Sequence, residues 1–271
     1  MDNKFLTRSF FSILLISLVF CAVYILPLWI FCVILSGFIA LGLYDFFNMV
    51  ENKGIFVYKY FGIVVGALLP IVIFIGNGLP EFKNFEPLFI VVASLFAFIL
   101  QFVRRENAQD RLVSMALTLF SLLYISWFLS FIMRIRFLDN GGNLVAFLII
   151  VTKSADIGAY LVGSRFGKNE LIPRISPKKT KEGTVGGILV SMILAVIAGR
   201  FLTGFSYLHL CMLGIILATL GQVGDLAESL IKRDCNVKDS GIYLKGIGGA
   251  LDVVDSLLFT APVFYFYIKT F

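Results

Sequence analysis

The stretch NLVAFLIIVTKSADIGAYLVG, residues 143–163, decides the fold class of this chain. Its apolar residues follow one another without the alternation of a strand, and its length matches the roughly 20 residues that a helix needs to cross a bilayer. Comparable runs fill most of the sequence, and we expect spans near 9–26, 28–47, 58–78, 87–103, 112–133, 143–163, 186–205, 208–226 and 250–269. The sequence therefore predicts an all-α, polytopic transmembrane protein with about nine spans.

The composition supports a protein whose solvent is mostly lipid. Of the 271 residues, 59% are apolar and only 15% are charged, whereas soluble domains average about 25% charged residues. The first run, 9–26, has no small-residue cleavage site and leads almost directly into the second run. We therefore interpret it as a retained span rather than a signal peptide.

The distribution of basic residues predicts the orientation. If the N-terminus is cytoplasmic, 17 of the 23 Lys and Arg residues fall on the inner side, in agreement with the positive-inside rule. Such charges face anionic lipid headgroups or a phosphorylated substrate, so we expect no nucleic-acid partner. The expected location is the cell's inner (cytoplasmic) membrane, with the active site facing the cytoplasm.

Polar residues are concentrated in the second half of the sequence. Residues 1–135 predict an N-terminal transmembrane scaffold, and residues 136–271 predict a C-terminal transmembrane catalytic region. Two long cytoplasmic loops are expected in the second region, near 164–185 and 227–249. Function should therefore be sought after residue 136.

Several familiar chemistries are disfavoured by the residue inventory. The four cysteines form no CxxC pair, and His209 is the only histidine, which argues against a zinc site or a Ser-His-Asp triad. The stretch 163–168 is one residue too short for a Walker A loop, and 246–249 is too short for a dinucleotide fingerprint.

Three sets of carboxylates stand at the predicted inner ends of helices. They are centred on Asp156, on Asp225 and on the pair Asp252 and Asp255. The helix-face neighbours of these residues, three, four or seven positions along, are Tyr160, Gly163, Glu228, Ser229, Lys232 and Ser256. Converging carboxylates repel one another unless a cation neutralises them, and hard oxygen ligands favour Mg²⁺. The alternative is a set of helix-end carboxylates that reach water or pair with loop lysines.

Basic and glycine-rich segments supply the complementary charge. Residues 175–183 hold three lysines and two hydroxyl groups before a glycine, and 232–241 repeat the combination. Lysine is a movable point charge for phosphate, and glycine lets the backbone approach closely. Ordinary positive-inside charge is the alternative explanation of these lysines.

This pattern resembles the phosphatidate cytidylyltransferase (CDP-diacylglycerol synthase) family. The residues that match its C-terminal signature are Ser229, Lys232, Arg233, Lys238, Asp239, Gly241, Leu244, Gly246, Gly248, Gly249, Leu251, Asp252 and Asp255. The upstream matches are Asp156, Gly158, Ala159, Tyr160, Gly163, Phe166, Gly167, Ser176, Pro177, Lys178, Lys179, Glu182, Gly183, Gly186 and Gly187. The resemblance covers about residues 150–262. Ile247 and Val253 depart from it, because they stand where the family has His and Arg.

The resemblance implies attack of a phosphatidate phosphate on the α-phosphorus of CTP, which gives CDP-diacylglycerol and pyrophosphate in phospholipid biosynthesis. The implied catalytic residues are Asp225, Lys232, Asp239, Asp252 and Asp255, with Asp225, Asp252 and Asp255 as ligands of Mg²⁺. The implied substrate-binding residues are Asp156, Tyr160, Ser176, Lys178, Lys179, Glu182, Ser229, Arg233, Lys238, Gly248 and Gly249. CTP and phosphatidate in the bilayer are the expected partners, and a second cation and a homodimer are left open.

Other functions fit parts of the pattern. An ion-coupled membrane transporter also uses intramembrane carboxylates, but it predicts charges near the midplane in two related halves. A family member with weakened catalysis or an altered substrate, including another CTP-dependent lipid transferase, is compatible with the two departures. Incorporation of labelled CTP into lipid separates these classes.

Overall fold

The computed structural model describes residues 3–82, 84–103, 111–241 and 248–271. For residues 3–12, 80 and 103 it describes the backbone only. It confirms the helical membrane fold. Eight described helices are long and apolar enough to cross a membrane: Leu28–Asn52, Lys59–Gly78, Phe85–Phe102, Arg111–Arg136, Gly141–Phe166, Lys181–Leu202, Tyr207–Asp234 and Ala250–Thr270. The first predicted span falls in a shorter apolar stretch, Ile13–Tyr24. The side of the membrane on which the N-terminus lies stays a prediction.

The elements follow one another with short connections. In chain order they are α1 (Asn3–Tyr24), α2 (Leu28–Asn52), α3 (Lys59–Gly78), η1 (Pro80–Phe82), α4 (Phe85–Val103), α5 (Arg111–Ser121), η3 (Leu122–Trp127), α6 (Phe128–Arg136), α7 (Gly141–Phe166), β1 (Glu170–Ile172), β2 (Ser176–Thr180), α8 (Lys181–Leu202), α9 (Tyr207–Asp234) and α10 (Ala250–Thr270). The segments α5, η3 and α6 are continuous, and η3 is a π-helical stretch within them.

The chain divides into two compact units. Unit 1 comprises Met1–Phe137 and Cys235–Val253, and unit 2 comprises Leu138–Asp234 and Val254–Phe271. The first residues of α10 therefore belong to unit 1, and the remainder of the helix belongs to unit 2. The assignment of scaffold and catalytic roles to the two sequence halves stays a prediction.

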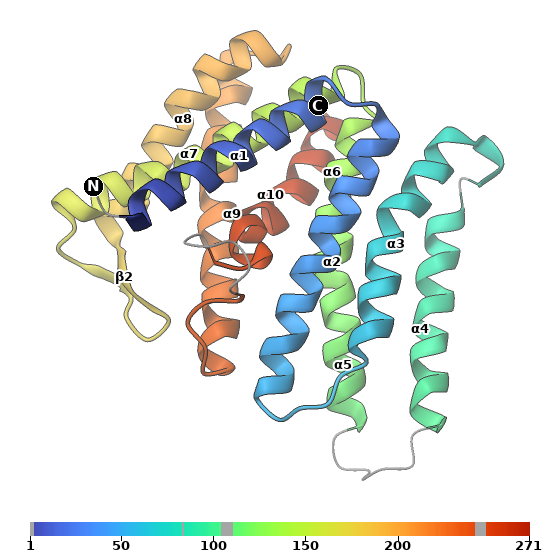
Figure 1. Ribbon diagram of the computed structural model, residues 1–271. Coiled ribbons are helices and arrows are strands. Elements are labelled where there is room, and N and C mark those ends of the chain that lie inside the picture. Colours follow the sequence, from blue (N-terminus) through green and yellow to red (C-terminus); the bar gives the residue numbers. More distant parts are fainter. Residues whose placement is uncertain (1–2, 83, 104–110, 242–247) are drawn as a thin grey trace. The chain divides into compact units, whose positions relative to one another are not determined.

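In unit 1, α3 runs beside α2 and α4 (Figure 1). Gly62 and Gly66 of α3 bring its backbone close to α2, because a Cβ atom at these positions would overlap Phe47 and Leu43 respectively. Phe47 and Leu43 are fully buried. Close packing at small residues is the usual means by which apolar helices associate in lipid, where hydrophobic burial gives no preference for helix contact.

In unit 2, α8 packs against α7 and α9, and a glycine again allows close approach of the helices. A Cβ atom on Gly214 of α9 would lie 2.5 Å from the Cα atom of Met192 in α8. The buried hydroxyl of Ser191 bonds to carbonyl oxygens on both neighbouring helices, at 3.0 Å from Val151 and 3.1 Å from Gly214. These contacts hold together the three helices that carry Asp156, Glu182 and Asp225.

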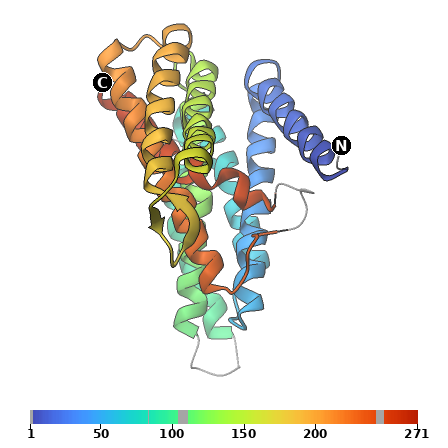
Figure 2. The same ribbon diagram turned by 90° about the vertical axis from the view of Figure 1, so that its left-hand side faces the viewer.

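A short hairpin occupies part of the first predicted cytoplasmic loop (Figure 2). Strands β1 and β2 are antiparallel, and Glu170 pairs with Thr180. Thr180 then begins α8, since its hydroxyl oxygen accepts a hydrogen bond from the Gly183 amide at 3.1 Å and so caps the helix. The hairpin thereby holds Lys179 at the start of a membrane helix.

We predict that Gly214→Ala destabilises the protein by about 1–3 kcal/mol, because the added methyl group meets backbone atoms that no rotamer change can move. Thermal unfolding in detergent micelles, followed by intrinsic fluorescence, measures the change. Gly37→Ala is the matched control, since Gly37 lies within α2 and no atom beyond the neighbouring backbone of this helix lies within 4 Å of the place that its added methyl group would take. Equal midpoints for the two variants would contradict the packing argument.

Candidate active site

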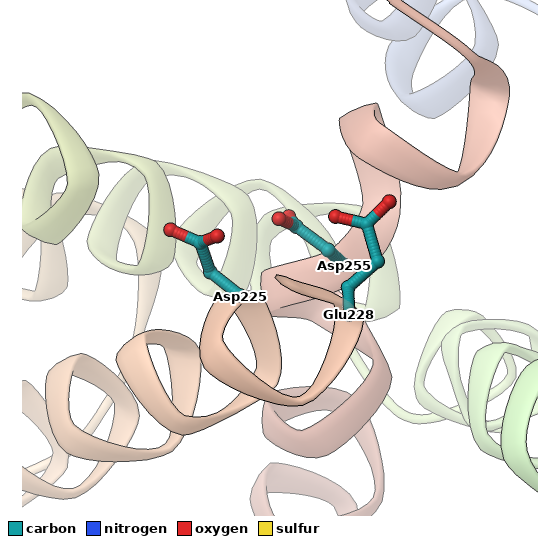
Figure 3. Close-up of side chains that lie close together, drawn as sticks. All are labelled: Asp225, Glu228 and Asp255. Atoms are coloured by element: carbon teal, nitrogen blue, oxygen red, sulfur yellow. The ribbon is translucent and has the colours of Figure 1, made fainter. Parts of the chain in front are cut away.

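Three carboxylates converge in unit 2 and form what we call the carboxylate cluster. Asp225 and Glu228 belong to α9, and Asp255 belongs to α10. One oxygen of each lies within 4.8 Å of the others, and Figure 3 shows the three side chains directed toward one region between the helices. The spacing of three residues on α9 explains the first pair, because residues three apart share a helix face.

Small residues on α9 allow the third carboxylate to join. A Cβ atom on Gly224 would lie 2.5 Å from the carbonyl oxygen of Asp255, so the backbones of α9 and α10 approach closely at this point. Gly221, three residues earlier, faces Ser256 on the same helix as Asp255. The glycines beside Asp225 therefore bring together carboxylates from two helices.

The cluster is shielded from solvent to different degrees. The Glu228 side chain is fully buried and that of Asp255 is 10% exposed, whereas one third of the Asp225 side chain is accessible. A buried carboxylate is costly unless it is paired or coordinates a cation. Of the three carboxylates, that of Asp225 is the most accessible to solvent.

Lysines from three elements pair with these acids. Lys179 of β2 lies 2.6 Å from an oxygen of Asp225, and Lys232 of α9 lies 2.8 Å from an oxygen of Glu228. The third, Lys153 of α7, lies 3.7 Å from Asp255. Positive and negative groups therefore alternate through the site.

A fourth carboxylate, Asp156 of α7, lies at the edge of this network. Its Oδ2 atom is 3.5 Å from the ammonium of Lys153 and accepts a hydrogen bond of 3.3 Å from the Ser256 hydroxyl. The structure thus brings three of the acids identified in the sequence, Asp156, Asp225 and Asp255, into one set of contacts. Lys153, which sequence reasoning placed within a span without a role, joins them.

The carboxylate cluster fits a divalent cation. Three carboxylate oxygens at mutual distances within 4.8 Å offer hard ligands in a half-enclosed position. Mg²⁺ is usually held by one or a few carboxylates and completes its shell with water and substrate phosphate oxygens. Glu228, a helix-face neighbour of Asp225 in the sequence that could be a ligand or could orient a lysine, lies with Asp225 and Asp255 in this cluster.

Asp252, one helical turn before Asp255, makes a separate set of contacts in unit 1. Its Oδ2 atom accepts hydrogen bonds from the Ser240 amide at 3.2 Å, the Ser240 hydroxyl at 2.8 Å and the Gly249 amide at 2.7 Å. Gly248 has φ +114°, which favours glycine, and a side chain there would overlap Asp252. Asp252 therefore links Ser240 and Gly249, which lie on either side of the segment 242–247. That segment, which includes the sequence candidates Leu244, Gly246 and Ile247, lies outside the described residues.

Asp45 of α2 supports the same segment, and sequence reasoning missed it. Its side chain is fully buried, and its Oδ2 atom accepts a hydrogen bond from the Leu251 amide at 3.2 Å. Added Cβ atoms on Gly241 and Gly249 would come against this carboxylate. A lone acid within an apolar span was the available signal, because ionisable residues at membrane depth usually mark a function.

The remaining sequence candidates make other contacts. Glu182 accepts hydrogen bonds from the Lys168 and Asn169 amides and thereby fixes the turn after α7. Arg233 donates to the Ile175 carbonyl at 3.3 Å and ties the hairpin to α9. Those with fewer described contacts are Tyr160, exposed on α7, Ser176 and exposed Lys178 on β2, Ser229, 3.4 Å from Asp225, and Lys238 and Asp239, exposed after α9.

Comparison with known proteins identifies the family. Residues 6–271 match the model of the cytidylyltransferase family, and the chain belongs to that family. It is 30% identical over 271 residues to a phosphatidate cytidylyltransferase of Synechocystis sp., with 89% of this chain and 88% of the relative covered. The family resemblance inferred from the signature residues is thereby confirmed.

Two shorter alignments show higher identity. The chain is 42% identical over 151 residues to a phosphatidate cytidylyltransferase of Bacillus subtilis, covering 55% of this chain and 56% of the relative. It is also 42% identical over 153 residues to the uncharacterized protein YnbB of Escherichia coli, covering 56% of this chain and 51% of the relative. In both, the chain spans about half the length of the curated relative it matches.

We predict that Glu228→Gln weakens binding of Mn²⁺, a paramagnetic substitute for Mg²⁺, by at least about tenfold, because one hard ligand loses its charge. Electron paramagnetic resonance titration of the purified protein without nucleotide measures the affinity. Glu170→Gln on exposed β1 removes a carboxylate away from the cluster and should leave it unchanged. If the two variants bind equally well, Glu228 is not a ligand.

Proposed function

We propose that this chain transfers the cytidylyl group of CTP to phosphatidate, giving CDP-diacylglycerol and pyrophosphate. The observation that carries the proposal is the carboxylate cluster with its paired lysines, set among membrane helices in a member of the cytidylyltransferase family. We further propose that the site faces the cytoplasm, where CTP is available. The bilayer then delivers the acceptor lipid sideways to the helices.

The reaction suits a site without a histidine base. An oxygen of the phosphatidate phosphate attacks the α-phosphorus of CTP, the bond between the α-phosphorus and the bridging oxygen breaks, and pyrophosphate leaves. The attacking oxygen is already ionised at neutral pH, so no proton has to be removed. The main barrier is repulsion between two polyanions and the growth of negative charge on the leaving group.

The carboxylate cluster would hold the cation, with Asp225, Glu228 and Asp255 as its ligands. A bound Mg²⁺ supplies positive charge that offsets the charge of the triphosphate. Asp252 is assigned instead to holding Ser240 and Gly249, because its Oδ2 atom already accepts three hydrogen bonds from these residues. Asp45 supports the same segment from α2.

Two lysines would bind the phosphates. Lys179 and Lys232 each neutralise one carboxylate, at 2.6 Å and 2.8 Å. If a cation were bound by the carboxylates, these ammonium groups would be available to phosphate oxygens, since lysine has a flexible stem and three donors. Exposed Lys178, Lys238 and Arg233 would add longer-range attraction for CTP.

A different acceptor lipid is the second candidate. Val253 places an apolar side chain on α10 at the position where the family signature has Arg. Ile247, which lies outside the described residues, stands where the signature has His. Loss of a basic group near an anionic substrate alters recognition of that substrate more than the transfer chemistry. Another phosphomonoester lipid would then replace phosphatidate, and the same cation and lysines would act on CTP.

The purified protein should convert labelled CTP into labelled lipid with phosphatidate and Mg²⁺. We expect Asp255→Asn to lower the rate by at least about a hundredfold, the size of loss seen when a charge-stabilising group is removed. Thin-layer separation of the lipid product measures it, with Glu170→Gln as the matched surface control. Absence of labelled lipid above the Asp255→Asn background, across phosphatidate and other phosphomonoester lipids, would reject the transferase assignment.

The two neighbouring lysines of β2 should differ in their effect. Lys179→Met should lower kcat/KM for CTP by roughly ten- to a hundredfold, as expected for a lost hydrogen bond to a charged group. Lys178 is exposed, so Lys178→Met should change the same constant by less than about threefold. Equal losses would indicate a diffuse electrostatic effect and would contradict a specific phosphate contact for Lys179.

A further inference from the structure

Lys153 stands midway along α7, between Thr152 and Ser154, within a helix that is long and apolar enough to cross a membrane. Charged groups at such positions are costly, face the interior of a helix bundle, and pair with other polar groups. Lys153 follows this pattern, and its side chain is 34% exposed. The proposed phosphate-binding lysines, Lys179 of β2 and Lys232 in the last turn of α9, lie on other elements, so Lys153 needs an explanation of its own.

The ammonium group of Lys153 is surrounded by oxygen atoms from two helices. It donates a hydrogen bond to the Ser256 hydroxyl at 2.8 Å and lies 3.5 Å from Oδ2 of Asp156 and 3.7 Å from Oδ1 of Asp255. The Ser256 hydroxyl in turn donates to Asp156. Two carboxylates and a hydroxyl thus surround one positive charge, which is an arrangement also typical of a small cation.

Asp255 joins this arrangement to the carboxylate cluster. One of its oxygens lies near Lys153, while an oxygen of the same carboxylate lies within 4.8 Å of Asp225 and Glu228 ligand atoms. Enzymes that use two metal ions bridge them in this way, through a shared carboxylate with the ions about 3.5–4 Å apart. Here the neighbouring position is taken by a covalently attached charge.

We propose that the Lys153 ammonium replaces a second metal ion, so that the site binds one divalent cation and requires no other. The proposal deepens the proposed function and rests on its divalent-cation site. A fixed ammonium neutralises Asp156 and Asp255 without the need to recruit an ion from solution. Lys153 is therefore a positioning residue, which acts through Asp255 on the cation.

A Lys153 ammonium that replaces a metal ion and one that only forms a structural salt bridge predict different results when the ammonium is removed. Lys153→Ala leaves two carboxylates and a hydroxyl around an emptied position, which a soluble monovalent cation can enter. A structural pair would instead show only lower stability, with no dependence on the type of cation present. Lys153→Arg keeps the charge and serves as the charge-conserving control.

The deciding experiment measures Mn²⁺ binding to the full chain in lipid nanodiscs by electron paramagnetic resonance, without CTP or acceptor lipid. The unmodified protein should bind one Mn²⁺ with an affinity that is independent of K⁺. Lys153→Ala should either bind a second Mn²⁺ or show Mn²⁺ binding that changes by at least about tenfold with K⁺ or ethylammonium, because one adjacent positive charge is worth that much at short range. Lys269→Met, at the exposed last turn of α10, controls for removal of a surface charge.

Two results would overturn the proposal. One is binding of two Mn²⁺ ions by the unmodified protein, which can be tested even if Lys153→Ala does not fold. The other is a folded Lys153→Ala protein with the original stoichiometry and no response to K⁺ or ethylammonium. These Mn²⁺ measurements involve no turnover and are therefore independent of the CTP assay. If the transferase assay failed, the number of bound Mn²⁺ ions would still test the role of Lys153.

Discussion

The pairing of carboxylates with lysine ammonium groups among membrane helices is the constraint on which unit 2 depends. Neither type of charge is tolerated alone at such depth, because an apolar surrounding cannot replace the lost hydration. The fully buried Glu228 is paired with Lys232, and the largely buried Asp255 has Lys153 nearby. Under the proposed function, the charges that are paired in this way are also those that would bind a cation and phosphates.

Close helix packing makes these pairings possible. Gly214 and Gly224 remove side chains where α9 meets α8 and α10, and Ser191 bonds to carbonyl groups on two neighbouring helices. The backbones can then approach until short side chains such as Asp reach across. In unit 1, Gly241 and Gly249 have the corresponding role beside Asp45. Three glycines of the family signature, Gly241, Gly248 and Gly249, thus lie where a carboxylate approaches the backbone.

The sequence predicted more of the fold than of the site. Long apolar runs such as 143–163 can be assigned as helices because the membrane permits few alternatives for an unpaired backbone. The carboxylates Asp156, Asp225 and Asp255 were also identifiable, because charge is rare in such runs. Asp45 was missed, since its contacts are with Leu251 and Gly249, which are distant in sequence. The hairpin of β1 and β2 was likewise expected only as a loop.

The sequence by itself determined the fold class, the family and the chemical character of the site, because hydropathy and residue types are local properties. Only the tertiary structure decided which acids lie together. Asp252 and Asp255 are one turn apart and equally acidic, yet Asp252 accepts hydrogen bonds from Ser240 and Gly249, whereas Asp255 meets Asp225 and Glu228. The physical reason is that a carboxylate's function follows from what lies within a few ångströms of its oxygens, and helix crossing sets those neighbours.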